Sequence, residues 1–382
     1  MDFTFTEEQQ AAAEAARAVF ADVPPEGGVP SPAVGIDPVS TDVDRELWDR
    51  LAKSDLIGIA LDEQYGGGGL DEIAWCLVLR ESARVLARVP LLETGAAALA
   101  IAAFGSAELR QRLLPEIAAG RLLVGVAAQG RTGHEPADEA VTAEPVPGGW
   151  LLRGLQTGVS WAPVMDLVLV PARSSRGTLL LLVDPRGAGV TLNRQVSTNG
   201  ELAGELVFDG AVVAASWQLG DPAADGSNWR AVRARMIVGV AALCLGLGEA
   251  ALRLTSGYAS KREQFGHPIA TFQAVAMQSA DQYINLRSME VTLWQAAWRI
   301  VAGAELADRL PLEADLATAK IWSAEGVRTI ASTAQHLHGG IGADLDYPLH
   351  RYHAWAKHLE LLLGPAAAYE QELGDLLAEH QL

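Results

Sequence analysis

Hydrophobic positions along the chain change their period twice. The first third carries apolar residues at helical spacing, the middle third carries short alternating or continuous apolar runs rich in Val and Leu, and the last part returns to long helical segments. This order predicts an α+β fold in three parts, because segregated runs of helices and strands form separate domains or layers. The predicted domains are 1–121, helical; 122–225, antiparallel β; and 226–382, a four-helix bundle.

Turn and capping signals set the limits of the predicted elements. Thr6, followed by two glutamates, begins a capped amphipathic helix that runs to Phe20. The Pro- and Gly-rich stretch 24–38 predicts a loop, and the glycines at 66–69 predict a turn. The other predicted helices are 44–54, 71–86, 92–104, 107–118, 228–262, 268–303, 312–337 and 349–379. The predicted strands are the runs LLVGVAAQ, AVTAEPV, GWLLRGL, DLVLVPAR, TLLLLVDP and ELVFDGAVV.

Composition and charge narrow the class of protein. Hydrophobic residues make up 49% of the chain and charged residues 20%, which is typical of a well-buried globular chain and not of a disordered one. The formal charge of −18 disfavours nucleic acid and anionic membranes as partners. An anionic ligand would therefore need a local basic site or a helix N-terminus.

The cysteines and the apolar runs predict neither a disulfide framework nor a membrane span. Cys76 and Cys244 lie in apolar helical surroundings and lack disulfide or metal-ligand spacing. The apolar run Met236–Gly248 is about 13 residues long, below the roughly 18 that cross a bilayer, and predicts a buried core helix. The N-terminus lacks the basic and apolar regions of a signal peptide, so we expect a cytoplasmic protein.

The stretch YASKREQFGHPIATFQ, residues 258–273, predicts a helix end, a Gly-Xaa-Pro break and a new helix that starts at Ile269. Arg262 beside a helix N-terminus could bind a phosphate through two hydrogen bonds, and Phe265 could lie flat on a ring. The plainer interpretation is a helix–turn–helix corner with one surface arginine.

The stretch QHLHGGIGADLDYPLHRY, residues 335–352, places Gly339, Gly340 and Gly342 directly after a helix. Backbone without side chains allows close approach of a flat or phosphorylated ligand. The alternative is a Gly-rich helix cap and loop. His336 and His338 do not predict a zinc site, because no Cys, Asp or Glu accompanies them at ligand spacing, and we predict no metal.

Together, these two stretches resemble the most specific signatures of the acyl-CoA dehydrogenase family of flavoproteins. Three further segments are similar to that family: MDFTFTEEQ, LAKSDLIGIALDEQYGGGGL and FGSAELRQRLLPEIAAGRL. The resemblance runs over essentially the whole chain. It implies the same order of helices, β domain and four-helix bundle, and it implies FAD as the cofactor, usually bound across a subunit boundary.

The resemblance also implies which residues contact FAD. Arg262, Gln264 and Phe265 match positions on the pyrophosphate or ribityl region. Ser160 in TGVSWAP matches the Thr or Ser that the family places near the flavin ring. The remaining implied contacts are Gln273, beside Arg262; His336, at a position where the family has glutamine; and Gly339 and Gly340, which would pack on the adenine half from a neighbouring subunit.

The chain also departs from the family pattern. The family's flavin loop, Thr-Glu-Pro-Xaa-Xaa-Gly-Ser-Asp, is not recognisable in AAQGRTGHEPADEA, residues 127–140. The usual glutamine falls on His336, with Gln335 one place earlier, and the Arg-Asp pair before the last helix reads Ala354-Trp355. These changes affect contacts to flavin and coenzyme A.

The most consequential departure concerns the catalytic base. Removal of the weakly acidic α-proton of an acyl thioester needs a carboxylate in a dry cleft. One family position for this Glu, directly before a Gly, falls on Leu363, and the other falls on Met236 or Leu243. Glu360, within one turn of Leu363, could act as a displaced base, or it is a solvated or ion-paired helix residue. The N–H of Leu363 remains as a donor for the thioester oxygen.

Three functions stay open at this stage. The first is a self-sufficient FAD-dependent acyl-CoA dehydrogenase that forms a 2-enoyl thioester and passes electrons to an electron-transfer flavoprotein. The second is a base-lacking subunit that completes the FAD site of a hetero-oligomeric dehydrogenase, as in bacterial degradation of steroid side chains. The third is a flavin oxidase or monooxygenase on the same fold. Either a homo-oligomer or a hetero-oligomer with a base-bearing paralogue fits, and the acyl carrier is coenzyme A or an acyl carrier protein.

Overall fold

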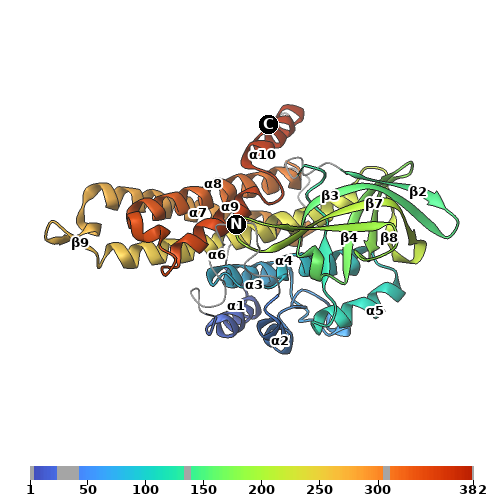
Figure 1. Cartoon of the computed structure of the whole chain (residues 1–382), viewed down its shortest axis with the longest axis horizontal. Helices are drawn as coiled ribbons and strands as arrows, with labels where there is room; N and C mark the ends of the chain where they lie inside the picture. Colours follow the sequence, from blue (N-terminus) through green and yellow to red (C-terminus); the bar gives the residue numbers. More distant parts are fainter. Residues whose placement is uncertain (1–3, 24–42, 133–138, 304–309, 381–382) are drawn as a thin grey trace.

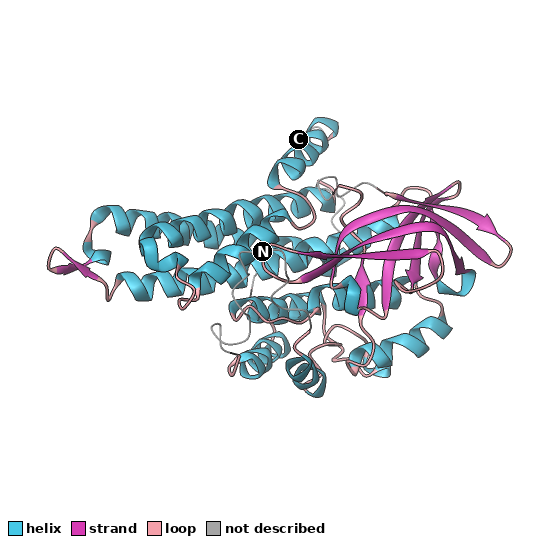
Figure 2. Ribbon diagram, viewed as in Figure 1, coloured by secondary structure: helices cyan, strands magenta, loops and turns pink. Residues whose placement is uncertain are grey.

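The computed structural model describes residues 4–23, 43–132, 139–303 and 310–380. A helical N-terminal part, a β-sheet and a long helical bundle follow one another, with the bundle and the sheet at opposite ends of the molecule (Figures 1 and 2). The predicted loop 24–38 lies outside the described residues. The predicted α+β architecture is confirmed, whereas the exact domain boundaries stay predictions.

Five helices form the N-terminal part, and their ends follow the predicted signals. They are α1 (Glu7–Phe20), α2 (Arg45–Lys53), α3 (Glu72–Arg84), α4 (Leu91–Phe104) and α5 (Ala107–Ala118). The side chain of Thr6 accepts a hydrogen bond from the N–H of Gln9, and the side chain of Gln9 accepts one from the N–H of Thr6. This reciprocal pair is a capping box and confirms the predicted start of α1.

The sheet has eight strands in the order β6-β7-β3-β2-β4-β5-β8, and β1 pairs with β4. The strands are β1 (Val124–Val126), β2 (Val141–Val146), β3 (Gly149–Ser160), β4 (Leu167–Ser174), β5 (Gly177–Val183), β6 (Val190–Val196), β7 (Leu202–Ala214) and β8 (Gln218–Ala223). The prediction of an antiparallel domain was wrong at β4, which runs parallel to both β1 and β2. A parallel pair needs a long crossover, which local periodicity does not reveal. Strands β6 and β8 were not predicted, because both are edge strands without an apolar run.

The bundle is built around α6 (Ser227–Ala259), with α7 (Gln273–Ala302), α8 (Leu312–His338), α9 (Leu349–Leu361) and α10 (Ala366–Glu379). The predicted single helix over 349–379 was wrong. Leu363 and Gly364 have φ of 66° and 101°, and Pro365 follows, so the chain turns sharply between α9 and α10. The helix predicted from Ile269 begins only at Gln273, after a short hairpin of β9 (Glu263–Gln264) and β10 (His267–Pro268).

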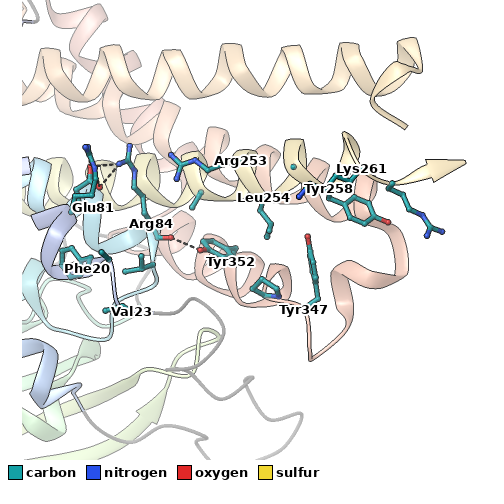
Figure 3. A pocket seen from close by; sticks show the side chains of 17 residues that line it. Phe20, Val23, Glu81, Arg84, Arg253, Leu254, Tyr258, Lys261, Tyr347 and Tyr352 are labelled. Atoms are coloured by element: carbon teal, nitrogen blue, oxygen red, sulfur yellow. Dashed lines mark hydrogen bonds and ion pairs between the residues drawn. The ribbon is translucent and has the colours of Figure 1, made fainter. Parts of the chain in front are cut away.

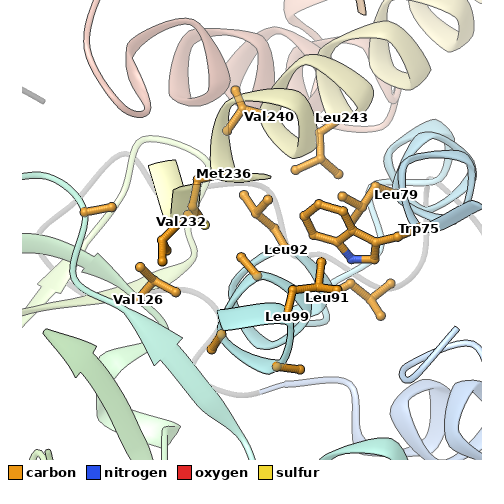
Figure 4. Packing of buried hydrophobic residues seen from close by; sticks show 14 of the residues in the cluster. Trp75, Leu79, Leu91, Leu92, Leu99, Val126, Val232, Met236, Val240 and Leu243 are labelled. Atoms are coloured by element: carbon orange, nitrogen blue, oxygen red, sulfur yellow. The ribbon is translucent and has the colours of Figure 1, made fainter. Parts of the chain in front are cut away.

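The core lies where α6 packs against α3 and α4. The buried side chains here are Trp75 and Leu79 of α3, Leu92 of α4, and Met236 and Leu243 of α6 (Figure 4). A Cβ added at Gly239 would stand 2.3 Å from Leu92, and one at Gly246 would stand 2.0 Å from the carbonyl oxygen of Arg80. These two glycines therefore allow helix contacts that no larger residue permits.

Helix α6 was predicted to be a core helix, and its burial confirms this. By length and composition it is apolar enough to cross a membrane, but 72% of its most apolar window is buried inside the protein. Cys76 and Cys244 are both buried and free, as predicted. Burial raises the pKa of the Cys244 thiol to about 12, so this group is unreactive at neutral pH.

Candidate functional site

The hairpin between α6 and α7 places Arg262, Gln264 and Phe265 at the free tip of the bundle, where β9 marks the end of the molecule in Figure 1. All three are exposed, and the Phe265 side chain is 90% exposed with φ of 56°. An aromatic residue in the left-handed region is strained. The Phe265 ring contacts the Phe272 ring edge-on, with centroids 6.2 Å apart. Phe272 directly precedes Gln273, the first residue of α7. The tip thus presents a guanidinium and an aromatic ring to solvent.

The second signature stretch comes back to the same end of the bundle. His338 is the last residue of α8, and its ring stacks on Tyr258 near the end of α6, with centroids 4.4 Å apart. The backbone C=O of Tyr258 accepts the N–H of Arg262 at 2.9 Å. His336 and the Gly339–Gly340 loop are exposed, and a Cβ at either glycine would meet nothing within 4 Å. The structure therefore unites the Arg262 hairpin and the glycine loop.

A groove of about 1160 Å³ runs from Arg262 back along α6, between α1, α3 and the start of α9 (Figure 3). Arg253, Lys261 and Arg262 line it, and none of the three makes an ion pair among the described residues. Tyr258 and Tyr347 form its end (Figure 3). In a chain of charge −18, this is a local concentration of positive charge suited to an anionic ligand.

Ser160 does not belong to this end of the molecule. It is the last residue of β3, and its side chain interacts with Glu93 of α4. The β9 tip is the far end of the bundle in Figure 1, whereas β3 belongs to the sheet on the other side of the molecule. Within one chain, the residue implied for the flavin ring and the residues implied for the nucleotide therefore form two separate half-sites.

A small cavity of about 30 Å³ lies beside Trp161, which follows Ser160. It is lined by Leu243 of α6 and by Leu362, the residue before the predicted base position. The indole N–H of Trp355 also faces this region and has no hydrogen-bond partner among the described residues. A volume of this size holds about one or two water molecules, whereas ligand pockets measure about 300–1000 Å³.

Two buried carboxyl groups line the same cavity. Burial raises the pKa of Glu93 to about 7, and hydrogen bonds, including one with Ser160, limit the rise. Burial likewise raises the pKa of Glu201 to about 8, against a hydrogen bond from Asn199 at 2.8 Å. His358 bonds to the Ser197 hydroxyl at 2.6 Å, and burial lowers its pKa to about 4. Near pH 7 the cavity therefore holds a mostly protonated Glu201 and a partly protonated Glu93 beside a neutral imidazole.

Leu363, at the predicted base position, is buried, and both its backbone N–H and its backbone C=O are hydrogen-bonded. Its N–H donates to Oε1 of Gln129 at 3.2 Å, and its C=O accepts from the Tyr369 hydroxyl at 2.7 Å. The N–H that the resemblance reserves for a thioester oxygen is therefore already engaged within the chain. Met236, the alternative base position, is packed in the apolar core (Figure 4).

Glu360 does not face the cavity. Its carboxylate pairs with Lys357 at 2.6 Å, and its backbone C=O accepts from the buried Lys320 at 2.9 Å. Burial lowers the pKa of Lys320 to about 8. The prediction that Glu360 serves as a displaced base finds no support in this geometry, since its side chain is turned into an ion pair.

Sequence reasoning missed Gln129, Glu93 and Glu201. Gln129 lies in the segment that departs from the flavin loop, of which 133–138 fall outside the described residues. Glu93 interrupts the apolar helix α4, and an acid within such a run was the available signal. Glu201 follows a turn, and only the three-dimensional fold reveals its burial.

The two half-sites differ in their fit to FAD. Unpaired cations, an exposed aromatic ring and a side-chain-free loop at the bundle tip fit the diphosphate and adenosine part. The cavity lined by Trp161, Glu93 and Glu201 is too small for an isoalloxazine ring, because it measures about 30 Å³. The described residues thus offer an open nucleotide half-site at the bundle tip, and only a small cavity next to the residue that follows Ser160.

Comparison with protein families shows which family this chain resembles over most of its length. A family model described as acyl-CoA dehydrogenase, N-terminal domain, matches residues 6–121, and one described as acyl-CoA dehydrogenase, C-terminal domain, matches residues 233–371. The chain is similar to acyl-CoA dehydrogenase FadE27 of Mycobacterium tuberculosis, with 37% identity over 90% of this chain and 91% of that protein. Acyl-CoA dehydrogenase FadE28 of the same organism is 32% identical over 86% of this chain and 91% of that protein.

Two similar solved structures are assemblies of paired subunits. The ChsE4–ChsE5 complex from Mycobacterium tuberculosis matches with a TM-score of 0.90 and 34% identity over 100% of both chains. A variant of the Tcur3481–Tcur3483 steroid ACAD matches with a TM-score of 0.87 and 36% identity over 98% of both chains.

Proposed function

The chain belongs to the acyl-CoA dehydrogenase family, and from that premise we propose that it is the base-lacking subunit of a hetero-oligomeric, FAD-dependent acyl-CoA dehydrogenase. In this role it completes the flavin site of a base-bearing partner with its own bundle tip. The likeness to a steroid ACAD and to the ChsE4–ChsE5 complex supports a steroid acyl-CoA as the substrate of the assembly. An electron-transfer flavoprotein is the proposed electron acceptor.

One observation carries this proposal: the cleft that would hold the reacting thioester is filled and has Leu363 in place of the base. Leu363 is buried, its N–H is bonded to Gln129, and the neighbouring cavity measures about 30 Å³. A general base typically contributes about 10²- to 10⁴-fold to rate, so its loss removes most activity. The nucleotide half-site around Arg262, by contrast, keeps the residues that an anionic cofactor needs.

The exposed face of α7 supports assembly with another subunit. Met277, Ile284 and Val291 are exposed large apolar residues at intervals of seven, and Tyr283 lies beside them. Such spacing places them along one side of a helix, as at helix–helix interfaces. Phe272, directly before α7, is also exposed and contacts Phe265 of the hairpin, so a partner that covers α7 as far as its first turn would come near Arg262. The proposed occupant is the base-bearing subunit.

Each group has a defined task under this proposal. FAD, when bound, accepts the hydride that leaves the β-carbon of the substrate. Arg262 of this chain neutralises the diphosphate with paired hydrogen bonds, and Phe265 covers a flat part of the nucleotide and excludes water. The partner supplies the base and the room for the acyl chain.

Flavin counting tests the proposal. The chain is purified alone and after coexpression with a paralogue that has Glu at the position of Leu363 or Met236. We expect no flavin on the chain alone, flavin on the mixed assembly, and a roughly 10- to 100-fold weaker FAD affinity when this chain carries Arg262→Ala, from the loss of a charge-assisted pair. Stoichiometric flavin on the isolated chain, bleached by an acyl-CoA under anaerobic conditions, would refute the proposal.

A second function, desaturation by this chain alone, is supported by Glu93. This carboxyl group lines the cavity beside Leu243, and its pKa of about 7 suits a general base. Under that alternative, the isolated chain binds FAD and its acyl-CoA oxidation is abolished by Glu93→Gln. Leu363→Glu separates the two functions further. Under the first function the isolated chain binds no flavin, so this substitution restores no activity to it.

A further inference from the structure

Three aromatic side chains connect the two parts of the nucleotide half-site. Tyr258 of α6 stacks on His338 at 4.4 Å with an interplanar angle of 21°. His338 Nε2 lies 2.9 Å from the hydroxyl of Tyr347, in the segment that leads into α9. Tyr258 and Tyr347 face each other at the end of the groove (Figure 3), with centroids 6.4 Å apart.

The imidazole of His338 is fixed by both of its nitrogens. Nδ1 lies 2.8 Å from the carbonyl oxygen of Ala334, an acceptor, so Nδ1 carries the proton and Nε2 accepts from the Tyr347 hydroxyl. With both nitrogens bonded and one face covered by Tyr258, the ring has a single orientation. Burial lowers the pKa of His338, which is consistent with this neutral tautomer.

The fixed His338 ring lies between the Arg262 hairpin and the Gly339–Gly340 loop, the two elements that would contact the nucleotide. On one side, the C=O of Tyr258 holds the N–H of Arg262, so the stack fixes where the hairpin leaves α6. On the other side, His338 directly precedes Gly339, whose φ of 63° starts the exposed loop. Neither glycine has a side chain to anchor the loop, and the bond from Gln335 Nε2 to the Gly339 oxygen at 3.0 Å is local to it.

We propose that Tyr258, His338 and Tyr347 form a positioning unit that sets the separation between Arg262 and the Gly339–Gly340 loop, and thereby the affinity of the mixed assembly for the diphosphate–adenosine half of FAD. This inference rests on the proposed function. The three residues act through Arg262 and the loop, not through the flavin ring. Their loss therefore weakens FAD binding selectively, and it leaves recognition of the ring by the partner intact.

The test measures dissociation constants of the assembled complex for FAD and for riboflavin, which lacks the diphosphate and adenosine. Tyr347→Phe removes the hydroxyl that His338 accepts from, and Tyr258→Leu removes the stack. Thr255→Val is the matched control, because it removes a buried hydroxyl bond of 2.7 Å, to the Ala251 carbonyl, on the same helix as Tyr258 but outside the groove lining. Melting temperatures of each complex are recorded alongside.

We expect Tyr347→Phe to weaken FAD binding about fivefold and Tyr258→Leu tenfold or more, with riboflavin affinity within twofold of wild type. Thr255→Val should leave both constants within twofold. Equal weakening of FAD and riboflavin would mean a merely structural role, and an unchanged FAD constant in Tyr347→Phe would also overturn the inference. If Arg262→Ala in the same complex leaves FAD affinity unchanged, the proposed function itself fails instead.

Discussion

The amide N–H of Leu363 is bonded to the side-chain oxygen of Gln129, 3.2 Å away and 234 residues earlier in the chain. The bond ties the sharp turn between α9 and α10 to the segment that follows β1. It also satisfies a backbone donor that would otherwise be buried without a partner.

Gln129→Ala should lower the free energy of unfolding by about 1–2 kcal/mol, because it orphans the N–H of Leu363. Urea unfolding measures the change. Gln10→Ala is the control, since Gln10 is exposed and bonds to the carbonyl of Phe5 at 2.8 Å, and it should cost less than about 0.5 kcal/mol. Similar small effects for both variants would contradict the importance of the Gln129 bond.

Lys320→Met should destabilise the chain by about 1–3 kcal/mol. The buried ammonium group bonds to the carbonyls of Leu359 and Glu360 at 3.4 and 2.9 Å, and methionine fills the space but donates nothing. Lys357→Met is the matched variant at the exposed end of the same region, where an ion pair with Glu360 contributes about 0–1 kcal/mol. Thermal unfolding of both variants provides the comparison, and the prediction fails if Lys357→Met costs as much as Lys320→Met.

Stability should fall as the pH rises toward 8. Glu93 and Glu201 bind protons more tightly in the folded chain, with pKa about 7 and about 8, than a free carboxyl group with its ordinary pKa of 4.5, so ionising them in the cavity costs stability. The lowered pKa of His358 gives a contribution to stability of the opposite sign, but that contribution changes with pH only between about pH 4 and pH 6.5. Between pH 6.5 and 8 we expect a loss of about 2 kcal/mol.

The double variant Glu93→Gln, Glu201→Gln should flatten that slope in denaturant titrations. The other polar groups that face the pair are Ser160, Asn199 and Arg88, and none of them changes charge in this window. A slope that survives the double substitution would assign the pH dependence to other groups.

Phe265→Gly should stabilise the isolated chain by up to about 1 kcal/mol and yet weaken flavin binding by the mixed assembly. Relief of a left-handed backbone at φ of 56° explains the first effect, and loss of an exposed aromatic ring explains the second. Chemical unfolding and a flavin titration measure the two quantities. If the substitution raised both the free energy of unfolding and the flavin affinity, or lowered both, the backbone strain at Phe265 would not be linked to flavin binding.

The apolar face of α7 predicts the effect of a charge on assembly. Ile284→Lys should leave the fold of the isolated chain unchanged, because Ile284 is exposed, and should abolish association with the partner subunit. Size-exclusion chromatography with light scattering distinguishes these outcomes. Gln111→Lys, at an exposed position on α5 away from α7, is the control, and equal assembly of both variants would place the interface elsewhere.

Local patterns predicted the elements whose causes are local. The Thr6 cap, the turn at 66–69 and the burial of α6 follow from capping chemistry, glycine φ values and a continuous apolar run. The parallel pairing of β1 with β4 and the break at Leu363–Pro365 depend on distant contacts or on one strained residue, and were missed. The cytoplasmic location stays a prediction.

The candidate site divides in the same way. Family motifs placed Arg262 and the Gly339–Gly340 loop in one site, and the structure brings them together through Tyr258 and His338. No motif indicated that Glu93 and Glu201, far apart in sequence, would meet in a cavity of about 30 Å³. Burial of an acid depends on the packing of every element around it, which a linear pattern does not encode.

Helix α6 carries Leu243 beside the small cavity and Tyr258 beside the nucleotide half-site, roughly 22 Å further along the same helix. Under the proposed function, this separation lets the chain do without a carboxylate in its own cleft and still keep the surface that it lends to its partner. Each of the two subunits then depends on the other for activity.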